Sequence, residues 1–517
     1  MAGRGTSSSL LLALPDPCLL EVMRSCAGDD QRSLFSAARA HSRLHQAAVL
    51  ALRSITAVIT QQQQVDGVLL YLSKHGQHVD STQMEGPEGR TVALRALPYN
   101  VQLGSLQLSR VRVQLPPKHG LEGVLGPAAR VAGLKQLRLD SCDLPYIHVT
   151  DNLAAALSLL PAGLEHLSIR RLVTMGGWGV PFPMGMLQQL QQLTYFELAD
   201  MWLKGPDQEQ QALQPLQALT RLADLRLVGL KARSTVEREY TDKIFASMLS
   251  GTHNLTCLVL SGVVELQPGV LAGKTKLQRL ELHYCAVPGG AAGASQLLSH
   301  LQQLQQLTHL RVAGTWADQA AHPPAAAYSA LTASSELQDL SVCGSALPTG
   351  AWQHMFPVDR QLPHLQYLDL SEVRQPGPIH GSPSAPDFSR LVSCCPGLQT
   401  LNLLQQRCKP QLLAPLQRLT ALQMGGDEVT AEDLQEVSQL TGLRQLTVVS
   451  VNDFRLELLL PLTELKELTT LHVLGRFIGS PHAVHLTSKV GHMLLCCLVC
   501  ACVSTSTCWV LVVPCLP

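Results

Sequence analysis

The chain has 517 residues with 39 acidic and 39 basic side chains, which gives a formal net charge of zero at neutral pH. Only 15% of the residues are charged and no basic stripe emerges, which argues against nucleic acid as the main partner because its binding needs clustered cations. The length is ample for a large apolar core, and an aromatic content of 4% predicts that leucine builds it.

The first patterned segment, residues 10–55, follows a stretch of residues 1–9 that we expect to be disordered. It carries a Leu-Pro pair, then paired leucines, then a second apolar run that ends on Ser42-Arg43-Leu44. Proline fits the first turn of a helix, where its missing N–H costs nothing. The predicted helices have more apolar side chains than so short a segment can bury alone, so we expect it to need a partner.

This segment resembles an F-box, although the tryptophan that usually closes the motif is absent. The resemblance implies a small all-α segment that binds a Skp-type adaptor and, through it, a cullin. The alternative is a helical cap on the structure that follows. We expect Leu19, Leu20 and Met23 to be interface rather than core residues. The full set predicted to bind the adaptor is Leu14, Pro15, Leu19, Leu20, Val22, Met23, Leu34 and Leu44.

Residues 56–100 predict a linker helix and a degenerate first repeat. The helix-like stretch runs from Val65 to His75, and Val79, Thr82 and Met84 follow with the spacing of a short strand. An atypical terminal repeat is what caps a repeat array.

One short phrase, aliphatic-x-x-aliphatic-x-aliphatic, recurs fourteen times over residues 101–480. Most of its spacings are 28 to 33 residues, and the shorter ones are 21 to 25 residues. Such a period is typical of a solenoid. The phrases begin at Leu103, Leu134, Leu164, Leu193, Leu222, Leu255, Leu277, Leu307, Leu337, Leu365, Leu398, Leu419, Leu443 and Leu468.

Within one phrase, Leu137 and Leu139 lie two apart and therefore share one face of a short strand. Stacked repeats would bury this face under a curved parallel sheet. The pattern resembles the leucine-rich-repeat family, whose fuller phrase is present over Leu134–Leu144 and Leu277–Val287, with Cys142 and Cys285 at the family's Asn/Cys position. The resemblance implies an α/β leucine-rich-repeat solenoid with convex-side helices, similar to the leucine-rich-repeat proteins of green algae.

The position of Cys142 normally holds a side chain that hydrogen-bonds the turns of its neighbours, but seven of the fourteen repeats place Val, Leu or Met there. We therefore expect irregular turns. Three segments predict convex-side helices: one capped by Thr430, one over Ser295–Leu307 and one over Ser389–Cys395. The proline-rich residues 374–387 predict a protruding loop.

No catalytic, cofactor or metal constellation emerges from the sequence, so we expect a protein that is not an enzyme and has no cofactor. His75 and His78 lie close together but have no third ligand at metal-binding spacing. Nine irregularly spaced cysteines precede residue 409, and Leu10–Leu14 is too short for a secretory signal. Free thiols in a reducing compartment are expected, in the cytoplasm or alternatively in the nucleus or ciliary axoneme.

The residues between the last two aliphatic positions of each phrase predict a row of side chains on the concave face. Charges of both signs occupy the second to the tenth repeat. Such side chains suit protein recognition, and the alternative is a solvated strand face. We expect them to face solvent in the free protein. The predicted partner-binding set is Arg138, Glu197, Arg226, Arg279, Glu281, His283, His309, Arg311 and Asp369.

Residues 481–517 form an apolar tail with six of the fifteen cysteines. Residues 493–513 are long enough to cross a bilayer, so a membrane anchor is one interpretation. We favour the other, an incorrectly assigned end of the coding sequence, because the repeat pattern stops near residue 478.

Two functions remain. The first is the substrate receptor of an SCF-type cullin ubiquitin ligase, with an unknown protein on the concave face. The second is a repeat scaffold without ligase linkage, for example one associated with the cytoskeleton or the ciliary axoneme.

Overall fold

The structure is a computed structural model in which the chain divides into two compact units, Met1–Thr252 (unit 1) and His253–Pro517 (unit 2). The helical segment thus belongs to unit 1 together with the first repeats. The residues described are 14–29, 31, 36, 39–88, 92–95, 97–98, 101–113, 133–144, 160–174, 181–182, 184–203, 219–230, 249–262, 265–316, 322–374, 388–406, 410–426, 429–454, 456–477 and 509–514.

Unit 1 has one main sheet in which every strand is parallel to its neighbours. Each strand has five residues, and successive strands pair without a shift in register. The sheet begins one strand earlier than the sequence predicted. In spatial order the strands are β1 (Ser54–Val58), β2 (Ser81–Glu85), β4 (Ser105–Ser109), β6 (Gln136–Asp140), β8 (His166–Arg170), β11 (Tyr195–Ala199) and β13 (Asp224–Val228).

The second and fourth residues of each strand form the core, as the leucine phrase predicted. Leu137 and Leu139 of β6 are fully buried and stack on Leu167 and Ile169 of β8. The predicted first repeat is present, because Thr82 and Met84 are buried in β2. The remaining three positions of each strand face away from the core and form what we call the concave face.

A second set of short strands follows the main strands of unit 1 after a turn. Four of these strands form a parallel sheet, and two others pair separately. One short 3-10 helix precedes β11. These elements are β3 (Val92–Leu94), β5 (Val111–Val113), β7 (Asp143–Leu144) and β9 (Val173–Thr174), the pair β10 (Pro181–Phe182) and β12 (Trp202–Leu203), and η2 (Met184–Gln189).

Helices α2 (Asp16–Asp29), α4 (Ser42–Ala51) and α5 (Gln62–His75) precede or flank the first strands. Helix α2 packs against α4. Helix α5 confirms the predicted linker helix and ends in the 3-10 turn η1 (Gly76–His78). It is tied to β3 by the side-chain amide of Gln62, which donates to the Ala93 carbonyl at 2.8 Å and accepts from the Ala93 N–H at 2.9 Å.

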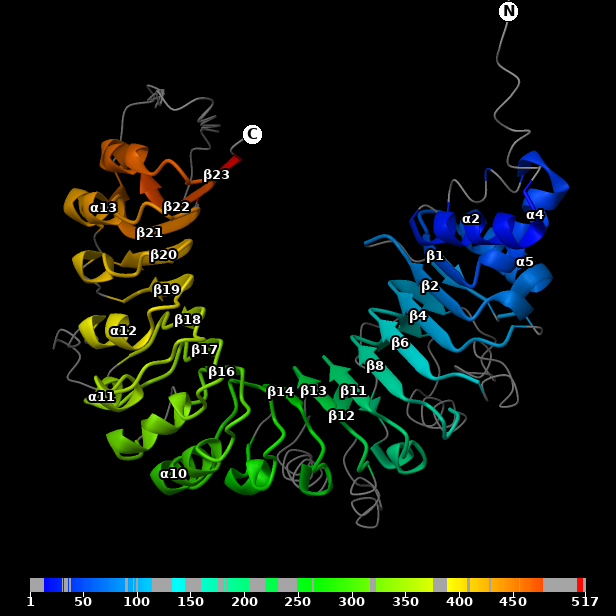
Figure 1. The fold of residues 1–517 in the computed structure, drawn as a ribbon. Coiled ribbons are helices and arrows are strands. Elements are labelled where there is room, and N and C mark those ends of the chain that lie inside the picture. Colours follow the sequence, from blue (N-terminus) through cyan, green and yellow to red (C-terminus); the bar gives the residue numbers. More distant parts are fainter. Residues whose placement is uncertain are drawn as a thin grey trace, which may run out of the picture. The chain divides into compact units, whose positions relative to one another are not determined.

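Unit 2 has a parallel row of nine strands with the same register from β14 to β22. Its convex-side helices lie on the outer side of that row (Figure 1). The strands are β14 (Cys257–Ser261), β15 (Arg279–His283), β16 (His309–Ala313), β17 (Asp339–Ser341), β18 (Tyr367–Asp369), β19 (Thr400–Leu404), β20 (Ala421–Gly426), β21 (Gln445–Phe454) and β22 (Thr470–Phe477).

The convex-side helices of unit 2 include those predicted from the sequence, with shifted ends. The predicted cap at Thr430 is confirmed, because the Thr430 hydroxyl accepts from the Asp433 N–H at 3.1 Å and the Asp433 carboxylate accepts from the Thr430 N–H at 2.9 Å. The elements are η4 (Pro268–Leu271), α10 (Gly290–Leu301), η5 (Ala325–Thr332), α11 (Ala351–Met355), α12 (Phe388–Cys394), η6 (Pro410–Leu413), α13 (Ala431–Val437) and η7 (Leu456–Glu464).

The turn after the strand recurs from β4 to β19, where a residue with a positive φ follows the strand, as at Ser141 (53°) in unit 1 and Tyr284 (53°) in unit 2. Its N–H donates to the end of the next strand, from Ser141 to Arg170 and from Tyr284 to Ala313. Where Cys142 occupies the following position, its thiol lies 3.5 Å from the Leu108 carbonyl, and Val111 simply fills the same place with a buried aliphatic group.

The first and last repeats differ, because Ile59 after β1 and Gly86 after β2 have no positive φ and the pairing of β21 with β22 shifts in register between Val449 and Asp453. The expectation of irregular turns is therefore wrong for the middle of the array only.

Strand β23 (Trp509–Pro514) pairs antiparallel with β22 at the end of unit 2. The rest of the apolar tail and the predicted loop after residue 374 lie outside the described residues. No helix among the described residues is both long and apolar enough to cross a membrane.

Candidate protein-binding surface

The predicted row of unit 1 is brought into register by the main sheet. Each member of the row is the Cα partner of the next member on the neighbouring strand. The members are Gln107, Arg138, Ser168, Glu197 and Arg226. They occupy the third position of five neighbouring strands, on the face opposite the core. The sequence therefore located a continuous strip of the concave face.

Glu197 is the centre of a hydrogen-bonded cluster in this strip. Its carboxylate accepts from the Ser168 hydroxyl at 2.7 Å, from Arg170 at 2.5 Å and from the Tyr195 hydroxyl at 2.9 Å. Only 3% of the residue is exposed. Burial opposes its ionisation, but these donors outweigh that effect and lower the pKa of Glu197 below its ordinary value. The cluster thus stabilises one fixed anion.

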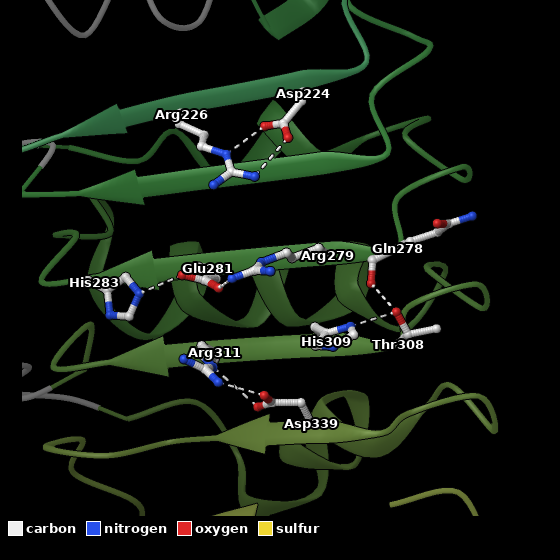
Figure 2. Close-up of polar contacts among 10 residues, drawn as sticks. All are labelled: Asp224, Arg226, Gln278, Arg279, Glu281, His283, Thr308, His309, Arg311 and Asp339. Carbon is white, nitrogen blue, oxygen red and sulfur yellow. Dashed lines mark hydrogen bonds and ion pairs between the residues drawn. The ribbon is translucent and has the colours of Figure 1, made fainter. Parts of the chain in front are cut away.

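Two aromatic rings and a guanidinium group pack against one another next to this cluster. The rings of His166 and Tyr195 are stacked at 3.9 Å with an angle of 4° between their planes. On the far side of Tyr195, the guanidinium of Arg226 lies 5.5 Å from the ring centre. Arg226 is held there by Asp224, with N–O distances of 3.0 and 2.9 Å (Figure 2). Burial, followed by the negative charge of Glu197, raises the pKa of Tyr195 to about 12, so its hydroxyl stays a donor.

The predicted row of unit 2 is also in register. It runs without a gap through the third position of nine strands. The first member is apolar, the charged members lie among the next four, and the later ones are neutral amides, a hydroxyl and an imidazole. In spatial order they are Val259, Glu281, Arg311, Ser341, Asp369, Asn402, Gln423, Thr447 and His472.

Glu281 is held between two neighbours on its own strand, β15 (Figure 2). Arg279 donates to one carboxylate oxygen at 2.5 and 2.8 Å, and the Nε2 atom of His283 lies 3.2 Å from the other. The His283 contact lowers the pKa of Glu281 most, burial opposes it, and Arg279 lowers it further, to about 2. Glu281 is therefore ionised throughout the physiological range.

Arg311 makes a second such pair across two strands (Figure 2). Its guanidinium donates to Asp339 at 2.6 and 3.3 Å and lies 5.3 Å from the centre of the Tyr367 ring. Next along the row, Asp369 accepts from the Ser341 hydroxyl at 3.2 Å and from the Ser371 hydroxyl at 2.7 Å. His309 is tied to the Thr308 hydroxyl at 2.8 Å.

The side chains of Arg279 and Arg311 face solvent as expected, being 41% and 36% exposed. Each is nevertheless paired with a carboxylate whose side chain is only 10 to 11% exposed. Reversing either charge would place two carboxylates together at a site with little access to water, which costs stability. Both arginines are therefore part of the fold as well as of the surface.

No family description matches the sequence, and no curated protein matches it. Solved structures with a similar fold include a leucine-rich-repeat protein of Leptospira interrogans, 16% identical, covering 79% of this chain and 86% of that one with a TM-score of 0.44. An internalin of Listeria monocytogenes is 16% identical, and the match covers 68% of this chain and 82% of the internalin with a TM-score of 0.37. The functional domain of InlJ from the same bacterium is 14% identical, and the match covers 80% of this chain and 76% of that domain with a TM-score of 0.40.

The strand register and the turn that recurs from β4 to β19 decide the fold. This chain is a leucine-rich-repeat solenoid. At these identities and TM-scores the neighbours carry no argument about function, so the surface has to be interpreted from its own residues.

The residues predicted to bind an adaptor fall into two groups. Leu19, Met23 and Leu44 are buried in the chain, which corrects the expectation that Leu19 and Met23 are interface rather than core residues. They lie on helices α2 and α4, which pack together. The second group has at least partly exposed side chains and comprises Leu14, Pro15, Leu20 and Val22; Leu34 lies outside the described residues.

The outer strand positions of unit 1 were not predicted, although in unit 2 the predicted set included the flanking residues Arg279, His283 and His309. His166, Tyr195 and Asp224 occupy the first strand position, and Arg170 occupies the fifth. Strand periodicity places the first, third and fifth residues of a strand on one face. The leucine phrase therefore predicts that residues at all three positions lie on the concave face.

A polar cavity of about 640 Å³ lies beside the concave face of unit 1, at the turns after β2, β4 and β6. Arg110 joins Glu85 and Glu88 there, and Arg112 lies 3.8 Å from Asp143. Small-molecule sites are usually apolar with a few polar groups, and this lining is mostly charged. No group of three metal-binding side chains occurs among the described residues.

Proposed function

We propose that this chain is a non-enzymatic protein-interaction module that binds its partner on the concave face. The observation that carries the proposal is that each unit has a row of polar side chains in register, Gln107 to Arg226 in unit 1 and Glu281 to His472 in unit 2, with most of the charged members held by contacts within and between strands. Side chains fixed before binding lose little entropy when a partner arrives. Tyrosine and arginine, the residues that most often dominate binding energies, occur together at Tyr195 and Tyr367.

The test is to place a bulky side chain in the row without touching the charged pairs. Gln107→Trp in unit 1 and Gln423→Trp in unit 2 each change a half-buried amide at the third strand position. Gln302→Trp is the matched control, since Gln302 is exposed at the end of α10, away from the strand row. The partners are first identified by co-purification from the cells that make the protein.

We expect at least one of the two concave variants to lower capture of these partners by about tenfold or more, and the control to leave it unchanged. Thermal unfolding of all three proteins serves as a folding check. Equal capture by all three would contradict binding on the concave face.

In its more specific form, the proposal makes the chain the substrate-recognition subunit of an SCF-type cullin ubiquitin ligase. The support is the F-box-like pattern, which the structure folds into the helices α2 and α4 directly ahead of the repeats. The chain would hold its substrate near the transferring enzyme and so raise the effective concentration of that substrate. We propose a cytoplasmic location, with the nucleus as an alternative.

The adaptor contact can be tested through the exposed side chains of the helical segment. Val22 is 38% exposed on α2, so Val22→Asp should abolish binding of a purified Skp-type adaptor without unfolding the helix pair. Leu70, which is 56% exposed on α5, provides the matched control Leu70→Asp. An adaptor that binds Val22→Asp and the unaltered chain equally well would rule out this form of the proposal.

The second candidate is a scaffold without ligase linkage, associated with the cytoskeleton or the ciliary axoneme. The burial of Leu19 and Met23 favours it, because fewer apolar side chains remain for an adaptor. Co-purified tubulin-associated proteins without adaptor or cullin would support the scaffold over the ligase subunit.

A further inference from the structure

Arg138 differs from the other arginines on the described strands of unit 1. Arg170 pairs with Glu197, Arg226 with Asp224, and Arg112 with Asp143. The side chain of Arg138 makes no hydrogen bond, and no ion pair of 4 Å or less with a carboxylate, in the described part of the chain. Its neighbours in the row, Gln107 and Ser168, are neutral.

The carboxylates near Arg138 accept hydrogen bonds from other residues. Glu197 already accepts three hydrogen bonds. Asp140 lies two residues along the same strand and accepts from the Ser141 hydroxyl at 2.9 Å. A half-buried guanidinium therefore remains on the concave face with its charge uncompensated by direct contact.

The stacked rings of His166 and Tyr195 lie on the two strands that follow Arg138. Both residues occupy the first position of their strand, on the same face as Arg138 at the third position of its own strand. The contact from Tyr195 to Glu197 fixes this arrangement before any partner binds.

We propose that Arg138, beside the fixed ring pair of His166 and Tyr195, is the recognition point for an acidic side chain of a protein partner. The inference rests on the proposed binding function and adds the chemistry of the partner. Arginine is suited to a carboxylate because its planar group can make two parallel hydrogen bonds. Phosphorylated segments are usually bound by clusters of arginines, and only one guanidinium is uncommitted on these strands.

The experiment uses the full chain and a fluorescein-labelled peptide in which glutamate alternates with glycine. Its counterparts carry glutamine, lysine or phosphoserine in place of glutamate. Binding is measured by fluorescence anisotropy for the unaltered chain, Arg138→Gln and Arg138→Glu. Arg444→Gln is the control, because the Arg444 side chain is exposed and, like that of Arg138, has no hydrogen-bonding or ionic partner among the described residues.

We expect the glutamate peptide to bind at least about tenfold more tightly than the glutamine peptide. Arg138→Gln should remove that difference, and Arg444→Gln should keep it. Arg138→Glu should bind the lysine peptide in place of the glutamate peptide, a rescue that a merely structural role would not produce. Thermal unfolding of Arg138→Gln should be unchanged, since no internal contact is lost.

The inference is overturned if Arg138→Gln binds the glutamate peptide as well as Arg444→Gln does, or if that peptide does not bind at concentrations up to about 1 mM. It is also overturned if the phosphoserine peptide binds more than about tenfold tighter than the glutamate peptide. The proposed function fails separately, when Gln107→Trp and Gln423→Trp both leave capture of the natural partners intact.

Discussion

Glu281 should make the stability of the protein depend on pH in a range that can be calculated. Its pKa is lowered from 4.5 to about 2 by His283 and Arg279. A carboxyl group whose pKa is depressed in the folded state contributes stability above its unfolded pKa, and loses that contribution as the pH falls toward its folded pKa. The window for Glu281 is therefore about pH 4.5 down to about pH 2.

The size of the effect follows from the same two pKa values. Their difference of about 2.5, at about 1.4 kcal/mol for each pKa unit, corresponds to about 3 kcal/mol at neutral pH. The side chain is only 10% exposed, so screening by solvent is limited. Integrating the proton binding of both states, about 2 kcal/mol of this is lost between pH 7 and pH 3.

The variant Glu281→Gln removes the titration and keeps the shape. Urea unfolding of the unaltered chain and of this variant, followed by tryptophan fluorescence, gives the free energy of unfolding at both pH values. We expect the variant to be less stable at pH 7, and the gap to shrink by about 2 kcal/mol at pH 3. Other carboxylates titrate in both proteins and cancel.

Glu467 supplies the matched control, because it is exposed in unit 2 and has no hydrogen bond or ion pair within the described residues. Glu467→Gln should follow the pH dependence of the unaltered chain. A gap between Glu281→Gln and the unaltered chain that stays the same at pH 7 and pH 3 would refute the linkage and the hydrogen-bonded geometry behind it.

Two further changes test the ends of unit 2. Thr430→Ala removes the side-chain acceptor at the start of α13 and should cost about 1 kcal/mol in urea unfolding, whereas an unchanged midpoint would mean that the cap is not formed in solution. Truncation after residue 485 removes β23, so the β22 amides should exchange hydrogen faster by mass spectrometry; unchanged protection would show that β23 does not pair there in solution.

The sheet and its register could be predicted because two periods fix them. The period of two within a strand assigns Leu137 and Leu139 to the core, and the recurrence of the phrase sets each strand beside the next. A slip by one residue would move the leucines into water, so the register is strongly specified.

The positive φ at the turns from β4 to β19 could not be predicted from residue type. Ser141, Arg171 and Asp200 adopt it in unit 1, although only glycine does so without steric cost. The N–H of each of these residues donates to the end of the next strand, as from Arg171 to Ala199. Ile59 makes the same bond to Glu85 without a positive φ, so the bond to the neighbouring repeat accompanies this conformation and does not by itself determine it.

The ion pairs could not be predicted from the sequence either, for a different reason. Arg311 and Asp339 are 28 residues apart and meet only because their strands are adjacent and their side chains lean toward each other. On one strand, Arg226 pairs with Asp224 whereas Arg138 does not pair with Asp140, at the same spacing of two. Side-chain rotamers decide between these outcomes, and neither spacing nor charge count encodes them.

The pairing of these charges bears on how a partner would be recognised. Most arginines and carboxylates of the concave face are neutralised within the sheet, so the face has little net field with which to steer a partner over long distances. Exposed charges would make association depend on salt, whereas committed pairs contribute shape and fixed hydrogen-bonding groups. Any dependence on salt that remains in partner binding should then disappear largely in Arg138→Gln, because that residue carries the uncommitted cation on the described strands of unit 1.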